Sequence, residues 1–415
     1  MKKHKVWLES FLLILGGILS GVLLSEMGLR VAGIEGVKKP ESYIDSDTNW
    51  YDLNDPYRGW AMRPGASGWW RGEGERSYIK ANSDGLRDRE HTKAKPKNTL
   101  RIAVLGDSFT EALQVPIEKT FWAEMERRLN KKCKFIQGRT VEVINFGVQG
   151  YGTTQELMTL RHKVWDYDPD VVLLAFYAGN DLINNSKKLE FHQRQPFYVY
   201  DKQGNLVLDM SFREMPIEAH NYLSFATVDY LPTWLVNHSR ILQVIRKVDL
   251  DNKKRTLQNE ELARYGKNFR EPTTKVWRDA WKITEGVVAL MAKEVKAKKA
   301  EFLMVMVTDP MQVHPHRNIR EKFMKDNKIT DLFYPEKRME ALSVREQFSL
   351  LTLAQFFQMY AEKYEMCLHG FKNAVECGGH WNADGHRLAG EKIAEQLCQS
   401  FQQSQSKQPQ SQSTR

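Results

Sequence analysis

The feature that most constrains the fold is a series of short apolar runs that alternate with segments of helical periodicity. The runs are bounded by turn residues, as buried strands are, and span residues 102–105, 141–145, 171–176 and 302–307. Apolar spacing of about 3.6 residues predicts helices near 118–129, 155–165, 275–299 and 390–401. This alternation predicts an α/β protein with three layers: a mostly parallel sheet covered by helices on both faces.

The first 32 residues have the character of a membrane anchor. Lys2, Lys3 and Lys5 precede a charge-free apolar run over residues 11–24, and a basic cluster before such a run stays on the cytoplasmic side of a membrane. No small-residue cleavage pattern follows, so we expect an uncleaved signal anchor; a cleaved signal peptide and a soluble core helix are the alternatives. The anchor predicts a single-pass membrane protein with its lysines inside and the chain after about Arg30 exported.

Three regions flank or interrupt the α/β domain, which we place at residues 99–401. Residues 33–98 are rich in glycine and tryptophan, and we interpret them as a connector packed on the domain edge. Exposed tryptophans there can stack on sugar rings, although buried anchors are commoner. Residues 185–272 contain a predicted hairpin and a helical stretch, and we expect an insertion over the carboxyl edge of the sheet. The Gln/Ser-rich residues 402–415 are predicted to be disordered.

Charge and cysteine content exclude several classes of function. The formal net charge is +9, but basic and acidic residues are interleaved along the predicted helices, which is typical of solvated faces and not of nucleic-acid binding. The four cysteines form no CxxC pair and no zinc-ligand cluster, so we predict no metal and no cofactor. Cys367 and Cys377 are close enough in sequence to staple a loop in an oxidising compartment.

A serine follows the first buried strand, in the run Gly106-Asp107-Ser108-Phe109-Thr110. The carboxyl ends of parallel strands are where open α/β sheets bind ligands. Taken alone, Asp107 and Ser108 have an ordinary explanation as a helix cap. A serine also needs a base and an oxyanion site before it becomes a nucleophile.

Three other segments supply groups of the kind that such a serine needs. A glycine-rich loop from Asn145 to Gly152 follows the second strand and can bring a backbone N–H to a bound oxygen. Asn180, after the third strand, offers a side-chain amide, and His380 lies just before the last helix. Singly, these residues have structural explanations as a turn, a cap and a core histidine.

Together and in this order, the four segments closely resemble the SGNH hydrolases of the GDSL esterase superfamily, over about residues 101–401, and with the anchor they resemble its membrane-anchored bacterial branch. The resemblance implies a flavodoxin-like fold, and a place in a bacterial cytoplasmic membrane with the body on the periplasmic side. The resemblance implies that Ser108 is the nucleophile and His380 the base. It also implies that the backbone N–H groups of Ser108 and Gly150 and the amide of Asn180 form the oxyanion hole. The expected activity is that of a serine ester hydrolase working through an acyl-enzyme.

The sequence departs from the family pattern in two places. Ala178 replaces a glycine in the third segment, which alters only a turn. The aspartate that the family places three, or in some acetyltransferase branches two, residues before the histidine is missing, because Cys377 and Gly378 occupy those positions.

The missing aspartate leaves several arrangements open. The site is either a Ser–His dyad or a triad with a displaced acid, for which Glu376 and Asp384 are the candidates. His386 is the rival base.

The expected substrate is an O-acyl group, in the first place acetyl, on an envelope carbohydrate or cell-wall polymer, with a small ester as the simpler case. Transfer of the acyl group to a glycan hydroxyl is an alternative that uses the same acyl-enzyme. A lipase or thioesterase is disfavoured, because the insertion shows no long apolar helical face. A non-catalytic glycan-binding protein on a decayed hydrolase fold is the alternative outside enzymes.

Overall fold

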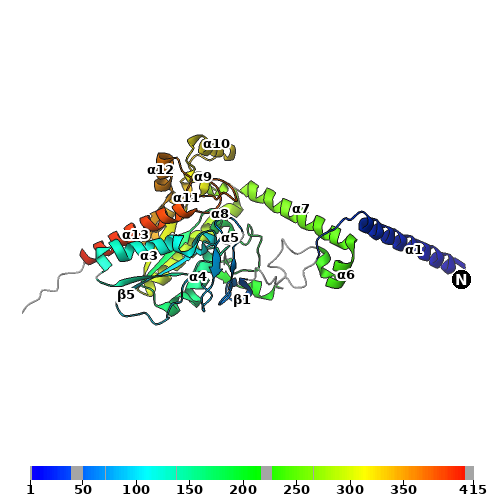
Figure 1. Ribbon diagram of the computed structural model, residues 1–415, viewed down its shortest axis with the longest axis horizontal. Coiled ribbons are helices and arrows are strands. Elements are labelled where there is room, and N and C mark those ends of the chain that lie inside the picture. The colour runs from blue at the N-terminus through cyan, green and yellow to red at the C-terminus, as the bar shows by residue number, and fades with distance from the viewer. Residues whose placement is uncertain are drawn as a thin grey trace, which may run out of the picture. The chain divides into compact units, whose positions relative to one another are not determined.

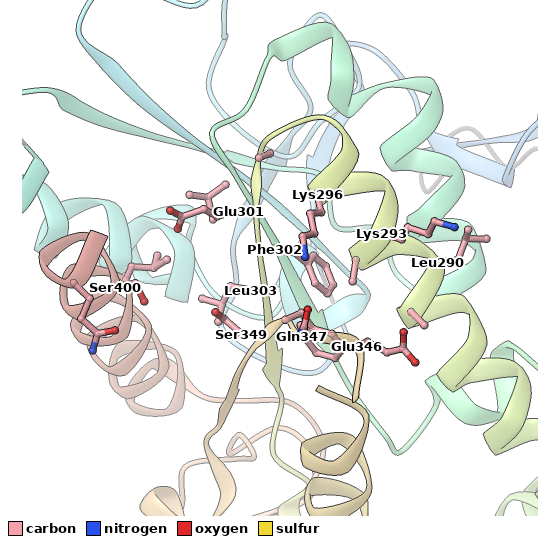
Figure 2. A pocket seen from close by; sticks show the side chains of 17 residues that line it. Leu290, Lys293, Lys296, Glu301, Phe302, Leu303, Glu346, Gln347, Ser349 and Ser400 are labelled. Atoms are coloured by element: carbon pink, nitrogen blue, oxygen red, sulfur yellow. The ribbon is translucent and has the colours of Figure 1, made fainter. Parts of the chain in front are cut away.

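The computed structural model describes residues 2–38, 50–70, 72–136, 138–215, 227–264 and 266–406 (Figure 1). The chain divides into two compact units. The smaller contains residues 1–46 and 216–264, and the larger contains residues 47–215 and 265–415.

The larger unit is built around a five-stranded parallel sheet with the order β11-β10-β7-β5-β6. Its strands are β5 (Thr99–Gly106), β6 (Thr140–Asn145), β7 (Val171–Phe176), β10 (Glu301–Met306) and β11 (Ser349–Thr352). The parallel sheet and the four strands expected from the sequence are confirmed. The edge strand β11 was not predicted, because its short run of two leucines between polar residues carries too little apolar periodicity.

Helices cover both faces of this sheet, as predicted for a three-layer α/β fold. Alternate residues of β5 point to opposite faces: Ala103 and Leu105 join one apolar cluster, and Ile102 and Val104 join the other. The first cluster includes α4 (Thr153–His162), α8 (Lys275–Ala297) and α11 (Tyr334–Glu346). The second includes α3 (Phe121–Lys132), α12 (Ala354–Tyr364) and α13 (Ala383–Ser406). Figure 1 shows α3 and α13 side by side.

Two disulfides close the larger unit. Cys133, at the end of α3, bonds to Cys398 in α13, with a Cα–Cα distance of 5.6 Å. Cys367 bonds to Cys377, which confirms the loop staple expected from the sequence. Helix α13 continues to Ser406, so the prediction of disorder from residue 402 onward is wrong for residues 402–406; residues 407–415 lie outside the described residues.

The connector forms two antiparallel hairpins within the larger unit. One pairs β1 (Tyr51–Asp55) with β2 (Gly59–Met62), and the other pairs β3 (Ser67–Trp69) with β4 (Tyr78–Lys80). Trp50 and Trp60 are buried anchors. A third hairpin, β8 (Phe197–Tyr200) with β9 (Leu206–Asp209), is the one that the sequence predicted at the start of the insertion.

Among its described residues, the smaller unit contains the α-helices α1 (Lys2–Val31), α6 (Thr233–His238) and α7 (Arg240–Arg264), and both α1 and α6 contact α7. The helical stretch predicted near residues 234–248 is therefore two helices. Ser10–Val31 is 22 residues long, apolar enough to cross a membrane, and exposed. The described residues contain the remaining α-helices α2 (Ser108–Glu111), α5 (Asp181–Asn184), α9 (Pro310–Val313) and α10 (Arg317–Asn327) in the larger unit.

Candidate active site

Ser108 lies at the first position of α2, directly beyond the carboxyl end of β5. The chain turns there at Gly106, where a Cβ atom would stand 2.2 Å from Thr110 Oγ1 and cannot be accommodated. Asp107 caps α2, because its carboxylate accepts a hydrogen bond of 2.9 Å from the backbone N–H of Phe109. The helix-cap explanation therefore holds for Asp107, and it leaves the hydroxyl of Ser108 for another partner.

That partner is His380. Ser108 Oγ lies 2.8 Å from His380 Nε2. On the other side of the ring, His380 Nδ1 lies 2.6 Å from Glu73 Oε2, and the backbone N–H of His380 donates to Glu73 Oε1 at 3.1 Å. One carboxylate therefore holds both the ring and the main chain of the histidine. This fixes Nδ1–H toward Glu73 and leaves Nε2 as the acceptor for the serine hydroxyl.

Glu73 comes from the connector, in the loop between β3 and β4, and sequence reasoning missed it. Gly379 allows its approach: φ there is +66°, and a Cβ atom would stand 2.0 Å from Glu73 Oε1. The loop is tied to the chain before His380 by Asn373, which donates to Gly72 O and accepts from Gly74 N, each at 3.1 Å. Burial raises the pKa of Glu73, but the hydrogen bonds and charge of His380 outweigh it and hold this pKa below the ordinary value.

The two carboxylates proposed from the sequence lie elsewhere. Glu376 is exposed, and Asp384 pairs with Arg387 at 3.2 Å. Both sequence proposals for the third member are therefore corrected to Glu73, and the bare Ser–His dyad is corrected as well. Nearness in sequence was a poor guide, because Glu73 and His380 are separated by 307 positions along the chain.

The rival base His386 is a core histidine. Its ring is buried between Phe121 and Trp381, and Nδ1 accepts a hydrogen bond of 3.3 Å from the Phe121 backbone N–H. Burial lowers its pKa to about 3, so the ring is neutral. His386 thus contributes to packing beneath the site, while His380 faces the serine.

The groups expected to form an oxyanion hole lie on three neighbouring strand ends. The backbone N–H of Ser108 is at the start of α2, where a helix offers its N–H groups no internal acceptor. The loop after β6 carries Gly150, which has a φ of +78°. Asn180, after β7, donates from Nδ2 to Asp107 Oδ2 at 2.8 Å, which orients the amide toward the start of α2.

Glu111 pins the glycine-rich loop to α2. Its Oε2 accepts from the backbone N–H of Gln149 at 2.8 Å and from the hydroxyl of Tyr51 at 2.7 Å. The side chain is fully buried, and burial raises the pKa of Glu111 to about 7. Arg87 adds a second connector contact, because its guanidinium donates to the carbonyls of Glu111 and Ala112.

No group of three His, Cys, Asp or Glu side chains able to hold a metal ion occurs among the described residues. The Ser108–His380–Glu73 array can carry out general-base and nucleophilic chemistry with protein groups alone.

No family model and no curated protein matches the chain. It is similar to the solved structure of an acetyl xylan esterase, with 13% identity and a TM-score of 0.38 over 72% of this chain and 99% of that one. A GDSL-like lipase from Bacteroides thetaiotaomicron gives 12% identity and a TM-score of 0.32 over 76% and 93% of the two chains. The lipase/acylhydrolase from Enterococcus faecalis gives 13% and 0.35 over 72% and 96%. At these scores the likeness carries no information about substrate.

Proposed function

We propose that the chain is a serine ester hydrolase of the SGNH type. The observation that carries the proposal is the continuous hydrogen-bonded array from Glu73 through His380 to Ser108, with distances of 2.6 and 2.8 Å. An imidazole held by a carboxylate on one nitrogen and a serine hydroxyl on the other is the arrangement that activates a serine nucleophile.

In the proposed mechanism, His380 Nε2 takes the proton from Ser108 Oγ as this oxygen attacks the ester carbonyl. Glu73 stabilises the imidazolium that forms. The backbone N–H groups of Ser108 and Gly150 and the amide of Asn180 donate to the developing oxyanion. His380 then protonates the leaving alcohol. In the second half, water attacks the acyl carbonyl and gives a proton to His380 Nε2, and His380 returns this proton to Ser108 Oγ as the carboxylic acid is released.

We propose an O-acylated carbohydrate as the substrate, with acetyl as the acyl group. The hairpin whose loop holds Glu73 also presents Trp69 and Tyr78, which are 48% and 55% exposed. They are direct partners in the β3–β4 register, with ring centroids 5.3 Å apart. The Arg76 guanidinium lies over the Trp69 ring, 4.6 Å from its centroid. Exposed aromatic rings and a guanidinium on the hairpin whose loop supplies Glu73 suit the apolar face and the hydroxyls of a sugar.

We further propose that α1 anchors the enzyme in the cytoplasmic membrane with the larger unit on the periplasmic side. The length and exposure of Ser10–Val31 support a span. All four cysteines are paired in two disulfides, which suits an oxidising compartment.

Labelling of the full chain with a fluorophosphonate probe tests the esterase proposal. We expect the wild type to be labelled and Ser108→Ala to be unlabelled with an unchanged thermal unfolding temperature. A folded wild-type protein that takes up no probe and releases no acetate from p-nitrophenyl acetate would refute the proposal.

A matched pair of variants tests the carbohydrate. Trp69→Ala should lower kcat/KM on an O-acetylated oligosaccharide about fivefold, since an aromatic contact contributes about 1 kcal/mol, and leave hydrolysis of p-nitrophenyl acetate unchanged. Tyr364→Ala removes an exposed tyrosine at the end of α12 and serves as the control. Equal losses on both esters would argue against a sugar contact at Trp69.

A further inference from the structure

A carboxylate near the end of α1 is bound by the start of α7. Glu26 Oε1 accepts a hydrogen bond of 2.9 Å from the backbone N–H of Arg240, and Oε2 accepts one of 3.2 Å from that of Ile241. The first N–H groups of a helix lack internal acceptors and carry its positive dipole end, so they stabilise an anion. The charge-free run of α1 ends at Leu24 and the candidate span ends at Val31, so Glu26 and the first turn of α7 lie near the carboxyl end of the span.

The chain that follows α1 runs along the next turns of α7. Val37 N–H donates to Gln243 O at 3.2 Å, and Arg246 Nη1 donates to Lys38 O at 3.1 Å. These contacts hold one side of α7 against the segment after the span. The described residues leave the adjacent side of the helix open to solvent around Ile245 and Val248.

That uncovered side is apolar. Ile241, Val244, Ile245 and Val248 follow the spacing of a single helical stripe. The first three line an open groove of ≈ 730 Å³ together with residues of α1, such as Ile18 and Val22. Ile245 and Val248 are 45% and 52% exposed. On α6, which contacts α7 (Figure 1), Trp234 is 66% exposed.

We propose that α6 and the first turns of α7 lie on the bilayer surface beside α1, with Trp234, Ile245 and Val248 entering the boundary between headgroups and acyl chains. The bilayer is the occupant because the groove is continuous with the exposed apolar surface of α1. Tryptophan is enriched at this depth, and helices with one apolar stripe bind there. The proposal rests on the membrane span proposed above and goes beyond ester hydrolysis.

The test places a nitroxide on the full chain in vesicles of phosphatidylethanolamine and phosphatidylglycerol. All native cysteines are paired, so Val248→Cys provides the labelling site. Lys247→Cys is the control, because Lys247 is the exposed neighbour that points away from the stripe. We expect the label at position 248 to collide more with oxygen and less with a water-soluble nickel chelate than the label at 247.

Three results would overturn the proposal. Equal nickel accessibility at the two positions would place the stripe in water, and spin–spin broadening at 248 alone would place a second copy of the chain on it. Release of the protein from the vesicles by alkaline carbonate would show that α1 does not span the bilayer, and this proposal would then fail as well. Fluorophosphonate labelling of the same vesicles reports separately on the esterase, so failure of the two proposals is distinguishable.

Discussion

Replacing Glu73 by glutamine tests the contact between the Glu73 carboxylate and His380 Nδ1, which the structure reveals and the sequence did not predict. The substitution keeps the size of the side chain and removes its charge, so the imidazolium formed during catalysis loses its counter-ion. With charge centres about 4 Å apart and an effective dielectric constant of about 20, the lost attraction is about 4 kcal/mol. This corresponds to about 10³ in rate. The Glu73 and His380 side chains are 20% and 26% exposed, so water screens the pair, and we expect kcat to fall between about 10² and 10³-fold.

The measurement is the rate of p-nitrophenyl acetate hydrolysis together with the rate of fluorophosphonate labelling. Both should fall in Glu73→Gln, while the unfolding temperature stays near that of the wild type. Glu376→Gln is the matched control, because it removes the exposed carboxylate that is nearest to His380 in sequence. Our reasoning would be refuted by a Glu73→Gln enzyme within twofold of the wild type, and equally by a large loss in Glu376→Gln.

Three further changes test the oxyanion hole, the buried carboxyl of Glu111 and the disulfide between α3 and α13. Asn180→Ala should lower kcat about 10²–10³-fold with little change in KM, as loss of an oxyanion donor does; an unchanged kcat would remove Asn180 from the oxyanion hole. The pKa of Glu111 is about 7 in the folded protein and about 4.3 in the unfolded chain. Between these two pH values the unfolded chain is ionised more readily, so the unfolding free energy of the wild type falls as the pH rises. Glu111→Gln should therefore gain stability over the wild type across this range, by at most about 1.4 kcal/mol per pH unit in urea unfolding, whereas a constant difference would contradict a buried carboxyl. Cys398→Ser opens a disulfide with a sequence separation of 265 and should lower the unfolding free energy by about 2–5 kcal/mol; no change in the guanidinium midpoint would contradict this.

Local sequence predicted the parallel sheet and the residues at its carboxyl edge. Ser108, Gly150 and Asn180 each follow a strand whose apolar run is continuous, and parallel strands bring their carboxyl ends to one edge. His380 was predicted from the resemblance of its segment, just before the last helix, to the SGNH hydrolases, and that helix packs on the same sheet. The fold therefore brings together residues that the sequence already places at the ends of elements.

Glu73 could not be found by the same reasoning. It lies in a loop of a two-stranded hairpin, and such a hairpin carries no information about which part of the sheet it packs against. The weak signal is an acidic residue between Gly72 and Gly74 at the tip of an aromatic hairpin. The sequence also did not predict that the insertion is divided, with residues 216–264 in the smaller unit. Nothing in residues 227–264 alone indicates contact with α1.

The position of Glu73 matters for how such chains are sorted. A comparison limited to the residues just before His380 finds Cys377 and Gly378 and would classify the protein as inactive. The acid is supplied from upstream of β5 and reaches the ring through space, with Gly379 leaving room for it. In chains of this kind, a gap in a motif is evidence of lost activity only after every segment able to reach the histidine has been inspected. A fragment trimmed to residues 99–401 would keep Ser108 and His380 and lose Glu73, the carboxylate that contacts the His380 ring.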